Sequence, residues 1–241
     1  MLGAEPVCHD ISPEITETLA VFPGDIPFSR QVTVNFGGGA NYLASSLHGT
    51  AHLGAHVDAP NHYHAGDAGI EARSLDYYLG ECQVITVALA RGARIGPEHL
   101  GGTEIRAKRV LFKTGSFPDP HHWNGDFNSL SPELVRKLSD EGVILVGIDT
   151  PSIDPCEDKI LEAHHAIHER DMAILEGIVL DAVRDGLYTL IALPLKIRGA
   201  DASPVRAVLL ESAGAKDVSS SAGAEKAAPK KPGSAKAGIR K

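Results

Sequence analysis

The sequence has few cysteines, few aromatic residues and no long hydrophobic run. Its three cysteines, Cys8, Cys82 and Cys156, are widely spaced and form no CxxC pair. This pattern argues against a disulfide framework and against a zinc site made of thiolates, and it fits a reducing cytoplasm. No apolar run approaches the roughly 20 residues that cross a bilayer. We therefore expect no membrane-spanning segment.

Basic charge is also scarce relative to acidic charge. The chain has 23 Lys and Arg against 31 Asp and Glu, a formal net charge of -8, which disfavours general binding to nucleic acid or to membrane surfaces. Near the N-terminus, Glu5 and Asp10 stand where a secretion signal would carry basic residues. These features predict a cytoplasmic protein that acts on a small molecule.

The composition changes sharply near the C-terminus. With 241 residues, 43% of them hydrophobic, the chain is long enough for one large globular domain. From Ser212 onward it consists mainly of Ala, Gly, Ser, Lys and Pro, a composition that cannot bury enough surface to fold. We predict one domain over residues 1–211 and a disordered basic tail over residues 212–241.

Apolar and β-branched runs predict an α/β fold with a mostly buried central sheet. Strands are expected over residues 42–47, 80–88, 109–115, 143–148, 173–180, 188–195 and 202–210. Ser131 and Pro132 form an N-cap and a first helical residue, so a helix should begin there and end near Gly142. Residues 161–168 resemble a second, short helix, and residues 116–128 should form a long irregular loop.

Phe22 precedes a turn signal, Pro23-Gly24-Asp25, between apolar segments of the stretch 11–34 that we expect to be short strands. Two interpretations of Phe22 and of Phe28, on the other side of the turn, are open. The aromatic side chains could be buried inside a hairpin, or they could line a pocket for an apolar substrate.

The stretch 48–64 concentrates the chemistry of the chain. It reads HGTAHLGAHVDAPNHYH, and His52, His56, Asp58 and His62 supply nitrogen and oxygen donors that suit a borderline transition metal. So many donors in so few residues are difficult to explain by packing alone.

The spacing of these donors excludes regular secondary structure. A helix would turn Asp58 about 200° away from His56, and a flat strand would separate His52 from His56 by roughly 13 Å. Gly54 permits unusual backbone angles, and Pro60 ends ladder pairing. We therefore expect a bent, extended loop that wraps its side chains round a metal.

Downstream residues add donors to this loop. Glu176 is an acid inside an apolar run, and a buried carboxylate is costly unless it is paired or bound to a metal. His164 lies in a second histidine cluster. With Asp58 placed to bridge, the donors suffice for two ions, which can supply hydroxide at neutral pH and polarise a carbonyl. The residues themselves thus favour metal-dependent hydrolysis.

The stretch 52–62 also resembles the HxGTHxDxPxH signature of the cyclase family, which includes bacterial kynurenine formamidases. Similarity continues through residues 147–155, 172–177 and 192–195, so that it covers roughly residues 11–210. The resemblance implies a swivelling β/β/α fold, a homodimer and a metal site. That site is commonly a dinuclear zinc centre, and Mn²⁺ is the alternative metal.

The resemblance also implies a ligand set, position by position. His52, His56 and Asp58 would hold one ion, and Asp58, His164 and Glu176 would hold the second. The choice of His164 over its neighbour His165 follows only from the family's spacing to the glutamate.

His62 matches the general acid/base of the family, expected to protonate the departing arylamine nitrogen. Two positions depart from the family pattern. Ala55 stands where the signature usually has Thr, and Phe22, our candidate substrate-binding residue, stands where the turn usually follows a Trp that helps enclose the substrate. These departures concern substrate identity and leave the metal ligands in place.

The activity that the resemblance implies is hydrolysis of N-formyl-L-kynurenine to L-kynurenine and formate. Within the family, the alternative is hydrolysis of isatin or of another amide. Two alternatives belong to other classes: an iron oxygenase with a two-His-one-carboxylate site, and a non-catalytic metal or small-molecule binding protein. Oxygen consumption would support the former, and metal binding without turnover the latter.

Overall fold

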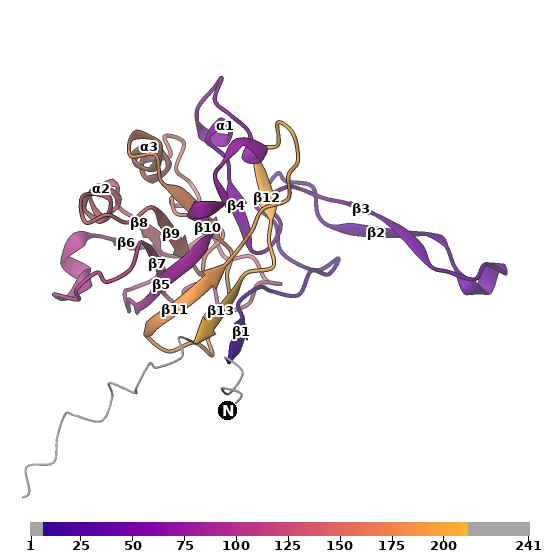
Figure 1. Cartoon of the computed structure of the whole chain (residues 1–241), viewed down its shortest axis with the longest axis horizontal. Coiled ribbons are helices and arrows are strands. Elements are labelled where there is room, and N and C mark those ends of the chain that lie inside the picture. The colour runs from indigo at the N-terminus through magenta and orange to yellow at the C-terminus, as the bar shows by residue number, and fades with distance from the viewer. Residues whose placement is uncertain (1–6, 212–241) are drawn as a thin grey trace, which may run out of the picture.

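A curled sheet occupies the centre of the fold (Figure 1). The structure is a computed structural model that describes residues 7–211, and within them nine strands form this sheet. In order across the sheet, they are β1 (Cys8–Asp10), β13 (Val208–Glu211), β11 (Gly186–Ile191), β5 (Leu79–Thr86), β7 (Arg109–Lys113), β9 (Leu145–Ile148), β10 (Ala173–Glu176), β4 (His56–Asp58) and β12 (Ala202–Pro204). The expected tail, residues 212–241, lies outside the described residues.

The strands β5, β7, β9 and β10 run parallel at the centre, and antiparallel strands flank them on both sides. Both faces of the central strands are covered. In β7, Val110 and Phe112 pack into one core cluster and Leu111 packs into the other. Burial of both faces explains why these strands are continuous apolar runs in the sequence.

Two helices, α2 (Pro132–Asp140) and α3 (Glu162–Glu169), lie beside each other against the sheet (Figure 1). They bury Leu134 and Leu138 from α2 and Ile167 from α3 in the same core cluster as Phe112. The side chain of Ser131 accepts a hydrogen bond from the backbone N–H of Leu134 at 3.1 Å, so the predicted N-cap is confirmed. The expected α/β class, a swivelling β/β/α domain, is confirmed as well.

The remaining elements are short. They are α1 (Pro60–Tyr63), the 3-10 helices η1 (Phe36–Gly38), η2 (Ile70–Ala72), η3 (Leu75–Tyr77) and η4 (Pro97–Leu100), the pair β6 (Arg94–Ile95) and β8 (Ser129–Leu130), and the pair β2 (Ser29–Val34) and β3 (Ala44–His48). The antiparallel pair β2–β3 forms an arm that extends away from the body of the molecule (Figure 1). No helix in the described part of the chain is long and apolar enough to cross a membrane.

Two strand predictions are wrong. Of the short strands expected within residues 11–34, β2 forms over residues 29–34, but residues 11–28 are irregular. Pro13, Pro23 and Pro27 provide no N–H for a ladder there. The turn itself is present, since the N–H of Asp25 donates to the carbonyl of Phe22 at 2.9 Å. The single strand expected over 202–210 is instead two strands, β12 and β13, in different parts of the sheet.

Candidate metal centre and catalytic pocket

The histidine stretch enters the fold as a bend, a strand and a helical turn. Gly54 has φ 59°, and its carbonyl accepts a hydrogen bond from Nδ1 of His56 at 2.9 Å. The bend was expected, but His56 and Asp58 then lie in β4. The prediction of an extended loop is wrong beyond that point, because Pro60 begins the short helix α1, which carries His62.

Pairing of β4 with β10 brings the loop to the expected glutamate. His56 is opposite Glu176 in the ladder, and its Nε2 lies 3.2 Å from Oε2 of Glu176. Gly177 follows with φ 66°, and a Cβ at this position would overlap the carbonyl oxygen of Gly54. The close approach of the two segments therefore requires glycine.

His164 reaches the same point from α3. Its Nε2 lies 3.4 Å from Oδ2 of Asp58 and 3.7 Å from Oε1 of Glu176. The adjacent His165 is exposed. The structure thus brings His164, and not His165, to the expected carboxylates.

His52 and His62 complete the cluster. Nδ1 of His52 lies 3.1 Å from Oδ1 of Asp58, and its Nε2 lies 3.1 Å from Oδ2 of Asp201. The His62 ring is tilted against the His52 ring with a centroid distance of 4.2 Å. All six polar residues expected in the site are therefore neighbours.

Asp58 shows whether this cluster fits a metal. Its side chain is buried, and neither carboxylate oxygen has a hydrogen-bond partner in the described part of the chain. A buried carboxylate without partners is costly, whereas histidine nitrogens on both of its sides are what a bridging ligand requires. The residues fit one or more divalent ions of the zinc class.

Two donor groups include Asp58, and each group has its ligand atoms within 4.8 Å of one another. One consists of Asp58 with His52 and His56, as the sequence predicts, and the other of Asp58 with His62 and His164. Glu176 is close to His56 and His164, but its Oε1 also accepts a hydrogen bond from the backbone N–H of Ile153 at 2.7 Å.

The charges of the cluster shift its pKa values in opposite directions. Burial lowers the pKa of His52, but the nearby carboxylates of Asp58, Asp201 and Glu176 together outweigh burial and raise that pKa to about 9. Burial likewise lowers the pKa of His164, but its hydrogen bond to Asp154 and the charges of Glu176 and Asp58 together raise that pKa to about 10. Burial lowers the pKa of His62, which leaves this ring neutral at pH 7. A metal ion held by His52 and His164 would therefore displace protons from both rings.

Two further residues of the site were not singled out from the sequence. Asp154 is fully buried, and its Oδ2 accepts a hydrogen bond from Nδ1 of His164 at 2.7 Å, which leaves Nε2 directed at the carboxylates of Asp58 and Glu176. Asp201 lies between His52 and His62. Asp154 belongs to the family-like block 147–155, which was a usable signal, but Asp201 stands in a turn with no local pattern.

A cavity of about 330 Å³ opens at the histidine cluster. Its apolar lining includes Leu19, Phe22, Phe117 and Ile178. Trp123 packs edge-on against Phe22 with a centroid distance of 5.2 Å. Phe22 therefore lines the cavity and does not form the core of a hairpin, whereas Phe28 is not part of the lining. Contact of Phe22 with a substrate stays a prediction.

Known proteins are similar to this chain. The family model described as "Putative cyclase" matches residues 9–155. The kynurenine formamidases of Bordetella avium and Bordetella pertussis are each 45% identical to the chain over 203 residues, which cover 84% of this chain and 97% of each relative.

Solved structures with a similar fold include metal-dependent hydrolases. The "Potential Metal-Dependent Hydrolase With Cyclase Activity" superposes with a TM-score of 0.75 at 25% identity, covering 85% of this chain and 98% of that one. Isatin hydrolase A from Labrenzia aggregata has a TM-score of 0.73 at 20% identity over 85% of this chain and 93% of its own, which shows the fold alone. This chain belongs to the cyclase family.

Proposed function

We propose that this protein hydrolyses the formamide of N-formyl-L-kynurenine, releasing L-kynurenine and formate. The observation that carries the proposal is the donor cluster round Asp58 at the end of a cavity lined by Phe22 and Phe117. An aromatic wall beside a polar cluster suits a substrate with an arylamide. The relatives at 45% identity are named kynurenine formamidases, which favours a linear formamide over isatin and hydrolysis over the oxygenase and non-catalytic alternatives.

We propose zinc as the metal, with two ions per subunit and Mn²⁺ as the alternative. His52, His56 and Asp58 would hold one ion, and Asp58, His164 and Glu176 the second. The unpartnered oxygens of Asp58 support its bridging role. When bound, the metal supplies hydroxide near neutral pH and polarises the substrate carbonyl.

His62 is proposed to move the proton. Its ring lines the cavity beside His52, and its lowered pKa keeps it neutral and able to accept a proton from water. It would then donate that proton to the arylamine nitrogen as the C–N bond breaks, a contribution of about 10² to 10⁴ in rate. Oδ2 of Asp201 lies 3.9 Å from Nδ1 of His62, too far for a hydrogen bond, so Asp201 places a negative charge beside the ring without fixing its orientation.

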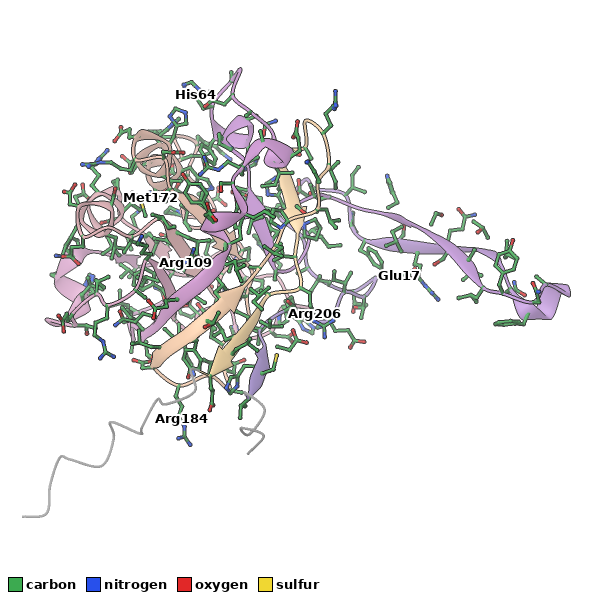
Figure 2. All side chains as sticks on the ribbon, viewed as in Figure 1. Glu17, His64, Arg109, Met172, Arg184 and Arg206 are labelled. Carbon is green, nitrogen blue, oxygen red and sulfur yellow. The ribbon has the colours of Figure 1, made fainter. Side chains whose placement is uncertain are left out.

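We propose a homodimer in which the arm formed by β2 and β3 contacts a second copy. Apolar side chains are exposed along this arm, which stands apart from the body (Figure 2). Phe36 is 65% and Leu47 69% exposed, and Tyr42 and Leu43 exceed half exposure. Exposed apolar side chains gathered on one projecting element are typical of an interface. Analytical ultracentrifugation of the wild type and of Phe36→Ser/Leu47→Ser would measure the mass, and a monomeric wild type would contradict the proposal.

The cytoplasm is the proposed location, and residues 1–211 are the proposed catalytic unit. All three cysteines are free, as a reducing compartment favours.

The activity is tested on purified protein with a known metal content. N-formyl-L-kynurenine, simpler arylformamides and isatin are offered in parallel, before and after chelation and after zinc is restored. We expect turnover of the linear formamide to exceed that of isatin, to fall on chelation and to return with zinc. Faster hydrolysis of isatin would refute the substrate, and metal binding without any turnover would refute the hydrolase.

A matched pair of variants connects the activity to the site. His164→Ala should lose metal and turnover, whereas His165→Ala removes an exposed histidine from the same helix and should lose neither. Equal effects in the two variants would refute the ligand assignment.

A further inference from the structure

A second group of donors lies outside the catalytic pocket, where α1 meets α3. It consists of His64, Asp67 and His168, whose ligand atoms all lie within 4.8 Å of one another. Nδ1 of His64 lies 3.1 Å and Nε2 of His168 lies 2.5 Å from the same oxygen, Oδ2 of Asp67. The two imidazole rings are stacked, with centroids 4.0 Å apart and planes 15° apart. Two histidine nitrogens therefore converge on one carboxylate.

These distances suit a tetrahedral ion. Zinc ligands at about 2.0–2.1 Å from the metal lie about 3.3 Å from one another, close to the separation of His64 from Asp67. The His168–Asp67 separation would lengthen by under an ångström, and both side chains are about one-third exposed and free to adjust. Because the two rings are stacked, the His64 ring must also rotate so that both nitrogens point at one ion, and its 49% exposure permits this rotation. Two imidazoles and a carboxylate form a donor set for Zn²⁺, Cu²⁺ or Ni²⁺, and Mg²⁺ or Ca²⁺ would prefer oxygen donors.

The group is separate from the catalytic cluster. His168 follows His164 by one turn of α3, and the Tyr63 ring lies between them, 5.4 Å from the His164 ring and 6.3 Å from the His168 ring. Figure 2 shows His64 at the outer edge of the molecule, and its side chain is 49% exposed. An ion could reach this group from solvent without passing through the catalytic pocket.

The backbone holds the three residues in place. His64 ends α1, and its N–H donates to the carbonyl of Pro60 at 2.9 Å. Gly66, with φ 89°, turns the chain back so that Asp67 faces the helix. His168 stands in the last turn of α3. Each ligand thus comes from an element whose position the fold already fixes.

We propose that His64, Asp67 and His168 form an outer binding site for one transition-metal ion of the zinc class, with water completing its coordination. An ion there connects α1, which carries His62, to α3, which carries His164. The three side chains are between one-third and one-half exposed, so this site binds an ion more weakly than the buried cluster. Ion binding at this outer site does not depend on which substrate the enzyme hydrolyses.

The test uses the enzyme already loaded with metal. Zinc chloride is titrated into the loaded protein by equilibrium dialysis, and bound zinc is counted by elemental analysis. The wild type should take up one equivalent more than His64→Gln and His168→Gln at the same free zinc. His165→Gln is the matched control, because it removes an exposed histidine from the same helix and should keep the extra equivalent. Magnesium chloride at the same concentration should not displace it.

Thermal unfolding gives an independent measurement. A ligand that binds only the folded state raises the melting temperature, so added zinc should raise the Tm of the loaded wild type and of His165→Gln but not that of the two variants. Equal zinc uptake and equal Tm shifts in the wild type and His64→Gln would overturn the proposal. His64 is half exposed, so this variant remains informative if His168→Gln folds poorly. Formamide turnover is measured separately, so failure of the outer site leaves the proposed activity untouched.

Discussion

Asp154 offers a sharp test of how the catalytic cluster is held together. It is fully buried, and its Oδ2 accepts hydrogen bonds from Nδ1 and the backbone N–H of His164 at 2.7 and 3.0 Å. Its Oδ1 accepts from the backbone N–H of Ala163 and from Nη2 of Arg94, both at 3.0 Å. Every neighbour of this carboxylate is therefore a donor.

Asp154→Asn keeps the shape of the side chain but replaces one acceptor with an NH₂ donor. If the NH₂ faces Ala163 and Arg94, it meets two other donors, the backbone N–H of Ala163 and Nη2 of Arg94. If it faces His164, the ring must accept at Nδ1 and carry its proton on Nε2, the nitrogen directed at Asp58. Either arrangement opposes metal binding through Nε2.

The expected loss follows from the role of such partners. Removing the group that orients a metal-binding histidine typically lowers metal affinity about 10- to 100-fold, or about 1.4–2.7 kcal/mol. The zinc affinity is measured by competition with a coloured chelator, and kcat/KM at saturating zinc is measured in parallel. We expect the affinity to fall by this factor and the activity to recover partly when zinc is raised.

Asp158→Asn is the control, because Asp158 also accepts from Nη2 of Arg94, at 2.7 Å, but has no contact with His164 among the described interactions. Its zinc affinity should match the wild type. The reasoning is refuted if Asp154→Asn folds, as judged by circular dichroism, and binds zinc as tightly as the wild type.

Four further predictions concern the site and its support. His62→Ala should keep its metal and lose about 10² to 10⁴ in kcat, whereas metal lost in step with activity would make His62 a ligand. Glu176→Ala should lower the metal count by about one equivalent, and an unchanged count would leave the glutamate a structural role. Gly177→Ala should lower the free energy of unfolding by at least about 1–2 kcal/mol because of its positive φ, and the overlap with Gly54 should lower it further. An unchanged Tm would show that the backbone shifts without cost to make room for the methyl group. Deletion of residues 212–241 should leave kcat/KM unchanged. A large decrease in kcat/KM would show that the tail contributes to turnover.

The sequence by itself determined features that depend on nearby residues. The central strands could be predicted because a strand buried on both faces must be apolar at every position, as in residues 143–148. The start of α2 followed from Ser131 and Pro132, whose side chains act within one turn. The donors of residues 52–62 could be found because they lie close together in the sequence, although the structure places His56 and Asp58 in β4 and His62 in α1.

Features that join distant parts of the chain were decided only by the tertiary structure. Asp154 and Asp201 reach the histidines through packing. Asp154 lies in a block that the family resemblance covers, but no local pattern marks Asp201. The role of Phe22 depended on Trp123 and the cavity wall, which come from another loop. The outer group pairs Asp67 with His168 across 101 positions. Side-chain contacts of this kind form when the sheet curls and α3 packs beside α1. The local sequence pattern does not show which distant residues this packing brings together.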